Sequence, residues 1–292
     1  MKKFLALPLI LLMLMAVGFS QDSQKSKSPE AGNAYNKGLD MVRKGDYKMA
    51  LPFFQEAIKY DPQFVQAHYM LGITLRRLEK IDEAVAAFRK TIEVDKQFEQ
   101  AYVALGSLQI DQEQYENALN SFNAVLSFND KSGKAYFGVG NAYQEMKDYK
   151  SAISPLQKAV AIDKEYDLAW NVLGICYEKE NRLEESAGAF QSAINSTKKG
   201  SNKGTYYYRV GNIYLKLNKF NEAESAYLNS LKFSKSQNVV GGANFGLGEV
   251  YKKLGQTQKA IEYFKKAARD RNWKGPADYE IDVLLNPDKY AN

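Results

Sequence analysis

The sequence has 292 residues, of which 45% are hydrophobic and 25% are charged, with a formal net charge of +6. Such a chain can bury a core, but its mild and dispersed basic excess does not indicate a nucleic-acid-binding protein, which needs a contiguous basic face. The single cysteine, Cys176, excludes an intramolecular disulfide, so packing must stabilise the fold.

Residues 1–20 are predicted to be a signal peptide. A short basic start precedes sixteen uncharged residues, 4–19, which would span roughly 24 Å as a helix, short of the roughly 30 Å hydrocarbon core. Gly18 and Ser20 form a small-x-small pattern, so cleavage is expected near Ser20–Gln21. An uncleaved signal anchor is the alternative. We therefore expect an exported protein without stable membrane insertion after cleavage.

Residues 21–30 are polar and are predicted to be a disordered linker, after which a repeat begins. Its clearest mark is a glycine that recurs at spacings of 34 and then 37 residues. These glycines are Gly38, Gly72, Gly106, Gly140, Gly174, Gly211 and Gly248. Alanine follows twelve residues after six of them, and a large apolar residue follows sixteen residues after all seven. Such regularity indicates a repeat architecture.

The fifth unit shows the pattern most fully, with Trp170, Leu173, Gly174 and Tyr177. This pattern resembles the tetratricopeptide repeat (TPR) over residues 31–272. The resemblance implies an all-α fold: an α-solenoid of seven helix-turn-helix units forming a right-handed superhelix, with a C-terminal capping helix and tail in residues 273–292. The units start near residues 31, 65, 99, 133, 167, 204 and 241.

Within each unit, the sequence predicts how the two helices meet. A glycine inside a helix costs about 1 kcal/mol relative to alanine, so its recurrence indicates close helix approach, and we expect it to face the alanine twelve residues later. The turns between helices are expected to use left-handed residues, namely Gly45, Asn181, Asn218 and Gly255. The second helices are expected to begin with caps that include Asp46, Asp82 and Asp148.

The sequence offers no catalytic arrangement. His68 is the only histidine, and it lies in the second unit, whereas Cys176 lies in the fifth, so the two cannot form a dyad in a stacked solenoid. We expect both to be packing residues. The repeat position of Cys176 also holds Asp40 and Thr74, which predicts a position that is not strictly buried. No catalytic residues, metal ligands or cofactors are predicted, and we do not expect an enzyme.

The resemblance places a partner-binding concave groove along the first helix of each unit. The fifth position of the unit is aromatic in five of seven units. Together with polar neighbours, the predicted partner-binding residues are Tyr35, Tyr69, Arg76, Phe137, Asn141, Tyr208, Asn212, Phe245 and Lys252. The alternative is that these rings only brace adjacent repeats. The fifth position is never lysine, so capture of a C-terminal carboxylate, as in chaperone-adaptor members of the family, is not expected.

The predicted function is a non-enzymatic protein–protein interaction scaffold or adaptor that binds a peptide or a partner helix. Its predicted location is the periplasm or cell envelope of a bacterium, with secretion and a membrane-associated complex as options, and no nucleic acid is expected as a partner. One alternative is a structural subunit of an envelope assembly or secretion machine. Another is a carbohydrate-binding protein that uses the aromatic groove.

Overall fold

The computed structural model describes residue 26 and residues 28–290, so the predicted signal peptide lies outside the described residues. Within this part of the chain the structure consists of fifteen α-helices and one short 3-10 helix, without a β-strand. The predicted all-α fold is confirmed.

The helices alternate between a first and a second helix of each repeat. The first helices are α1 (Pro29–Arg43), α3 (Val65–Arg77), α5 (Glu99–Asp111), α7 (Gly133–Glu145), α9 (Asp167–Lys179), α11 (Gly200–Lys216) and α13 (Gln237–Lys253). The second helices are α2 (Tyr47–Tyr60), α4 (Ile81–Val94), α6 (Tyr115–Phe128), α8 (Tyr149–Ile162), α10 (Leu183–Ser196), α12 (Phe220–Phe233) and α14 (Thr257–Ala267).

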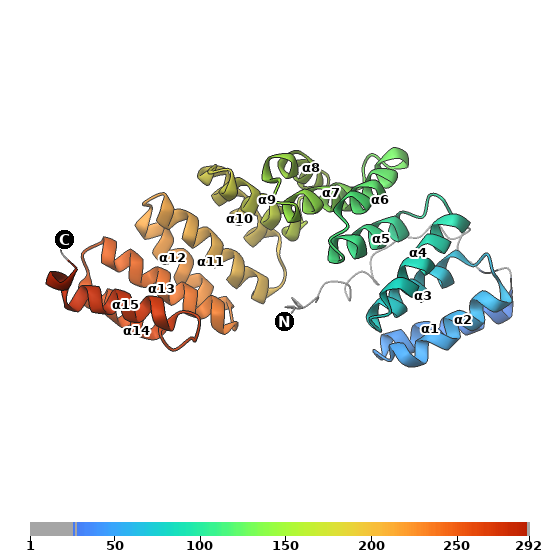
Figure 1. Ribbon diagram of the computed structural model, residues 1–292, viewed down its shortest axis with the longest axis horizontal. Helices are drawn as coiled ribbons and strands as arrows, with labels where there is room; N and C mark the ends of the chain where they lie inside the picture. The colour runs from blue at the N-terminus through green and yellow to red at the C-terminus, as the bar shows by residue number, and fades with distance from the viewer. Residues whose placement is uncertain (1–25, 27, 291–292) are drawn as a thin grey trace. The chain divides into compact units, whose positions relative to one another are not determined.

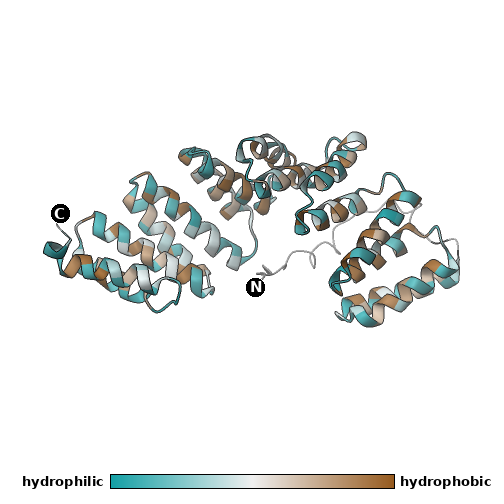
Figure 2. Cartoon of the chain, viewed as in Figure 1, coloured by the Kyte–Doolittle hydropathy of each residue, from teal (hydrophilic) through white to brown (hydrophobic). Residues whose placement is uncertain are grey.

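A further helix, α15 (Lys274–Leu285), packs on α14 and is followed by the short helix η2 (Pro287–Lys289). Consecutive helices pack against each other from α1 to α4 within residues 1–108, and from α6 to α15 within residues 109–292 (Figure 1). The chain forms two compact units, residues 1–108 and residues 109–292, which divide within α5. Apolar and polar residues alternate around the helices, as amphipathic packing requires (Figure 2).

Every first helix ends in the same turn, which reverses the chain. After α1, Gly45 has φ of 78°, and the N–H of Asp46 donates to the carbonyl of Met41 at 2.9 Å. This bond spans the last turn of the helix and satisfies a carbonyl that would otherwise have no partner. The four predicted left-handed residues are confirmed. Three further turns use residues that the sequence did not single out: Glu79, Glu113 and Lys147.

The predicted caps of the second helices are confirmed at two of three positions. Asp46 accepts a hydrogen bond from the N–H of Met49 at 3.0 Å, and Asp148 accepts one from Ser151 at 3.1 Å. The prediction for Asp82 is wrong, because Lys80 is the capping residue of α4 and Asp82 lies in the first turn. There its charge interacts favourably with the positive end of the helix dipole.

At six of its seven positions, the repeated glycine faces a large side chain of the second helix. A Cβ atom on Gly38 would lie 2.7 Å from the Phe54 ring, and one on Gly174 would lie 2.8 Å from the Phe190 ring. Since Cβ atoms essentially never come so close to other atoms, only glycine fits. The expected alanine partner is therefore wrong as the nearest neighbour: the residue sixteen positions later fills this space, and the alanine twelve positions later is buried beside it. At Gly140 that alanine also comes close, because the Ala152 carbonyl oxygen would lie 3.2 Å from a Cβ atom there.

Cys176 lies in the core of α9, with 0% of its surface exposed, and packs with residues of α8. Its repeat position is also buried at Thr74, so the expectation of an incompletely buried position is confirmed in the first unit alone. Only Asp40, in α1, is exposed at this position. From the second unit onward the preceding repeat covers the position, as the α8 contacts of Cys176 show.

We predict that Gly140→Leu lowers the free energy of unfolding by about 1–3 kcal/mol, because the new side chain overpacks the helix pair. A Cβ atom there would lie 2.5 Å from Leu156 Cγ and 3.2 Å from the carbonyl oxygen of Ala152. Urea denaturation monitored by circular dichroism measures the change. The matched control is Gly188→Leu, at an exposed helical glycine whose Cβ would meet no atom within 4 Å. Equal stability of both variants would contradict the prediction.

Candidate partner-binding face

The nine residues predicted to bind a partner all lie on first helices, divided between the two compact units. Tyr35, Tyr69 and Arg76 lie within residues 1–108. The other six lie within residues 109–292: Phe137, Asn141, Tyr208, Asn212, Phe245 and Lys252. We call the side of the first helices that carries these positions the first-helix face, and describe it separately in each unit.

In residues 1–108, the two tyrosines of this face join adjacent elements. The Tyr35 ring centroid lies 5.7 Å from that of Phe54 on α2 and 4.9 Å from that of Phe64, which precedes α3. Tyr69 repeats the arrangement one unit later, at 5.9 Å from Phe88 and 5.3 Å from Phe98. Each ring therefore contacts the second helix of its own repeat and the start of the next repeat.

The same geometry recurs in residues 109–292. Phe245 lies 5.2 Å from Phe264 on α14 and 5.1 Å from Trp273, which precedes α15. Phe137 lies 4.8 Å from Tyr166, which precedes α9. These tilted ring pairs stabilise the stacking of repeats beyond the area that they bury. The bracing role, which the sequence left as an alternative, thus holds for these rings, and the side chains of Phe137 and Phe245 are half-buried.

Burial changes the ionisation of the two tyrosines in residues 1–108. Loss of solvent raises the pKa of both Tyr35 and Tyr69 to about 12. For Tyr69 the nearby Arg76 guanidinium acts in the opposite direction and lowers the pKa, which places Arg76 close to this ring. The phenols are therefore neutral at physiological pH and serve as packing groups.

Two of the polar residues predicted to bind a partner already form contacts with other side chains of this protein. The Asn212 Oδ1 atom accepts a hydrogen bond from the Tyr227 hydroxyl at 2.8 Å. Lys252 forms an ion pair with Glu280 of α15 and lies 3.9 Å from Glu249. Asn141 is half-buried, and its side chain has no hydrogen bond to other described residues.

The first helices of residues 109–292 also carry buried polar atoms that sequence reasoning missed. Asn171 Oδ1, Arg209 Nε and Glu249 Oε1 are each buried without a hydrogen-bond partner in the described part of the chain. They occupy the fifth, sixth and ninth positions of their repeats, at or beside the predicted groove positions. An interruption of the aromatic ladder at Asn171 was the only sequence signal.

Burial affects the charge of two of these groups. It lowers the pKa of Arg209, whereas the nearby Glu178 carboxylate acts in the opposite direction. Burial also raises the pKa of Glu249, whereas the positive charge of Lys252 acts to lower it. An unsatisfied buried polar atom costs about 1–3 kcal/mol, and more when it is charged. This part of the first-helix face therefore carries polar groups that a bound molecule could satisfy.

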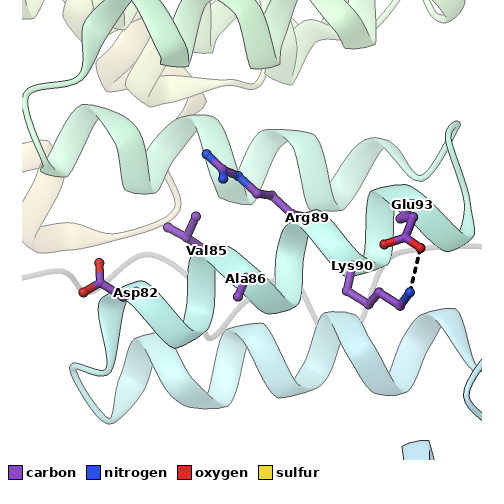
Figure 3. Close-up of a pocket in the computed structure, with 6 residues that line it drawn as sticks. All are labelled: Asp82, Val85, Ala86, Arg89, Lys90 and Glu93. Atoms are coloured by element: carbon purple, nitrogen blue, oxygen red, sulfur yellow. Dashed lines mark hydrogen bonds and ion pairs between the residues drawn. The ribbon is translucent and has the colours of Figure 1, made fainter.

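Two hollows lie away from this face. The first is lined by six residues of a single helix, α4, where Lys90 and Glu93 form an exposed ion pair at 2.7 Å (Figure 3). The second, of about 760 Å³, lies among α8, α9 and α10, with Trp170 and Leu173 in its lining. In its wall, Gln157 donates a hydrogen bond to the Tyr177 hydroxyl at 2.8 Å. In the second hollow the Ser192 and Ser196 hydroxyls donate to backbone carbonyls. Glu185 pairs with Arg182, so these hydroxyls are not joined to the carboxylate.

The chemically reactive residue types are separated and packed. Burial raises the pKa of the Cys176 thiol to about 12, so the nucleophilic thiolate is suppressed. His68 is buried in the other compact unit, with Nε2 2.9 Å from the Pro62 carbonyl oxygen. Among the described residues, His, Cys, Asp and Glu side chains do not gather in a group of three or more that could hold a metal ion.

Comparison with protein families decides the classification. A family model described as the middle TPR-like domain of cilia and flagella-associated protein 70 matches residues 39–195. A tetratricopeptide-repeat model matches residues 204–237 and 242–269. The chain belongs to the tetratricopeptide-repeat family. Members of this family generally act as non-enzymatic scaffolds that bind protein or peptide partners, and this coarse function applies to the chain.

Solved tetratricopeptide-repeat structures share the fold. A protein from Parabacteroides merdae is 19% identical, with a TM-score of 0.59, and the match covers 89% of this chain and all of that one. PilF from Pseudomonas aeruginosa is 15% identical, with a TM-score of 0.61, over 76% of this chain and 96% of that one. No curated protein sequence matches the chain.

A third structure, YrrB, is described as a TPR protein with an unusual peptide-binding site. It is 20% identical, with a TM-score of 0.50, over 64% of this chain and 94% of that one. At these identities the likeness concerns the fold.

None of the described helices of the present TPR protein combines the length and apolar character needed to cross a bilayer.

We predict that the free energy of unfolding falls between pH 10 and pH 12, in part because of Tyr69. Below pH 10 this phenol is neutral in both states; above it, the unfolded state ionises first, since the folded pKa is raised to about 12. Tyr69→Phe should therefore reduce the pH dependence in urea titrations across this window. Tyr60→Phe, at a tyrosine that is 50% exposed, is the control and should leave the slope unchanged. The same slope in Tyr69→Phe and wild type would contradict the prediction.

Proposed function

We propose that this TPR protein is an exported, non-enzymatic scaffold of a bacterial cell envelope that binds a peptide or partner helix along its first-helix face. The observation that carries the proposal is a set of buried polar atoms without a hydrogen-bond partner, namely Asn171 Oδ1, Arg209 Nε and Glu249 Oε1, the last of which has only a 3.9 Å ion pair with Lys252. Their positions on consecutive first helices, α9, α11 and α13, suit a ligand that runs across the repeats. Polar groups of an extended peptide or of a helix would supply the missing hydrogen bonds.

The aromatic residues support binding in a secondary way. Their rings are held by neighbouring rings, so the exposed part of each half-buried side chain is presented in a fixed position. A rigid aromatic surface loses little conformational entropy when a partner packs on it. YrrB, whose structure is described as having a peptide-binding site, provides a precedent among proteins with a similar fold. The exported location is supported by the sequence of residues 1–20.

A structural subunit of an envelope assembly is the second candidate function. The hollow among α8, α9 and α10 favours it, because the exposed Ala161 and the half-buried Trp170 line an open recess there. A permanent partner could cover such a surface. The carbohydrate alternative has less support, since sugar platforms need open ring faces and the rings here pack against one another at interplanar angles such as 47° and 58°.

Site-specific photo-crosslinking in the cells that make the protein tests the proposal. A photoreactive amino acid is placed at Asn141 of α7 or Lys179 of α9, both on first helices. The matched control positions are Lys150 of α8 and Glu184 of α10, exposed residues on the second helices of the same repeats. We expect one common crosslinked partner from positions 141 and 179, recovered with the envelope fraction, and none from the controls.

Other outcomes separate the candidates. Crosslinks that form only from positions 150 and 184 would overturn the first-helix face and support the structural subunit. Recovery of the common product in the cytoplasm would overturn the exported location while leaving the binding face intact.

A further inference from the structure

Basic residues collect at one end of the helices in the last three repeats. They lie where each second helix ends and the next first helix begins, in residues 197–203, 232–238 and 265–274. We call this set the basic edge: Lys198, Lys199, Lys203, Lys232, Lys235, Lys265, Lys266, Arg269, Arg271 and Lys274. Asp270 is the only acidic residue in the three segments, and its Oδ1 accepts a hydrogen bond from the N–H of Asn272 at 2.9 Å.

Contacts between the segments make the edge continuous. The Lys203 ammonium lies 5.7 Å from the Phe233 ring centroid, which joins the start of α11 to the end of α12. The Trp273 Nε1–H donates to the carbonyl of Asn238 at 3.1 Å, which joins the segment after α14 to the start of α13. All three segments belong to residues 109–292, so they form one surface within a single compact unit.

The longer repeats explain why the edge is found here. The first helices α11 and α13 have 17 residues, whereas α7 and α9 have 13, so the last repeats extend about one additional turn at this end. The spacing change from 34 to 37 residues therefore coincides with added basic surface. The sequence indicated a dispersed basic excess, but in the structure the basic residues of these three segments lie together at one end of the helices.

Most of this charge is not neutralised by the protein itself. Lys198 pairs with Glu165 at 3.5 Å and Lys266 with Glu262 at 2.7 Å. Among the described residues, the other eight basic side chains of the edge have no ion-pair partner, and seven of these eight are exposed. Crowding of like charges raises the free energy of the unbound surface, which favours an acidic partner.

We propose that the basic edge binds an acidic, extended polypeptide segment of a partner protein. This contact goes beyond the proposed function, because it uses the helix ends of the last three repeats and not the first-helix face. Clusters on three successive repeats suit a chain that crosses them with its carboxylates distributed along its length. Lysine and arginine side chains donate charge-assisted hydrogen bonds to such carboxylates.

The surface is less suited to the two other anionic partners. Binding to a lipid surface is strengthened by exposed apolar side chains, and none of the large ones exposed in the described chain lies in these segments. Single-stranded nucleic acid needs free aromatic faces for stacking. At this edge Tyr207 and Phe233 stack on each other at 5.8 Å, and Trp273 packs on Phe245.

The test measures binding of the full chain to a fluorescently labelled glutamate–serine peptide by anisotropy. The edge variant combines Lys199→Glu, Lys235→Glu and Arg269→Glu, one exposed residue from each segment. The control variant combines Lys147→Glu, Lys150→Glu and Lys219→Glu, which make the same change in net charge at the opposite helix ends. Circular dichroism confirms that both variants are folded.

We expect the edge variant to bind the peptide at least roughly tenfold more weakly, and the control variant to bind within about twofold of wild type. Binding should weaken as salt is added, because the charges are exposed. Equal weakening in both variants would overturn the proposal, as would the absence of binding by wild type. Stronger binding to phosphatidylserine vesicles or to duplex DNA than to the peptide would also overturn it.

Discussion

In six of the seven repeats, the close approach of the two helices depends on a glycine that lies against a large side chain sixteen residues later. At Gly38, Gly174 and Gly248 the neighbour is a phenylalanine ring, and a Cβ atom would come within 2.5–2.8 Å of it. The ring can be fully buried only because the glycine leaves room for it. The helix propensity lost at each glycine is offset by burial of a whole aromatic side chain, worth about 1.5–3 kcal/mol.

The same first helices carry both the joints between repeats and the proposed binding face. Rings such as Tyr69 and Phe245 contact the next repeat, so their substitution by alanine would disturb stacking as well as binding. The groups that stacking does not satisfy are the buried polar atoms of Asn171 and Arg209. A repeat protein is stabilised by contacts between adjacent repeats. The polar groups that these contacts do not satisfy remain available to a partner.

Much of the fold could be predicted because each repeat obeys local rules. The left-handed turns at Gly45 and Asn181 follow from residue type, whereas Glu79 and Lys147 adopt the same conformation because the turn hydrogen bonds outweigh their modest preference against it. The ring partner of each glycine could not be read from spacing alone, since both the twelfth and the sixteenth following residues return to the facing helix. The packing role of Cys176 was expected, but the full closure of its repeat position could not be read from residue types, because it depends on the preceding repeat.

The candidate site was predictable only in outline. The aromatic positions followed from the repeat register, but their bracing role depends on residues such as Phe98 and Trp273 that precede the next helix. The engagement of Lys252 by Glu280 required the position of α15. The basic edge joins segments more than thirty residues apart, and no local pattern in the sequence brings them together.

A double-mutant cycle between Gly140 and Leu156 tests the central glycine contact most directly. The cycle compares the unfolding free energies of Gly140→Leu, Leu156→Ala and the double variant. Because Leu156→Ala removes the side chain that the new leucine would strike, the double variant should be more stable than the sum of the two losses predicts, by about 0.5–3 kcal/mol. Gly140→Leu combined with Phe264→Ala, in a distant repeat, should be additive. Additive losses in the Gly140–Leu156 pair would contradict the account.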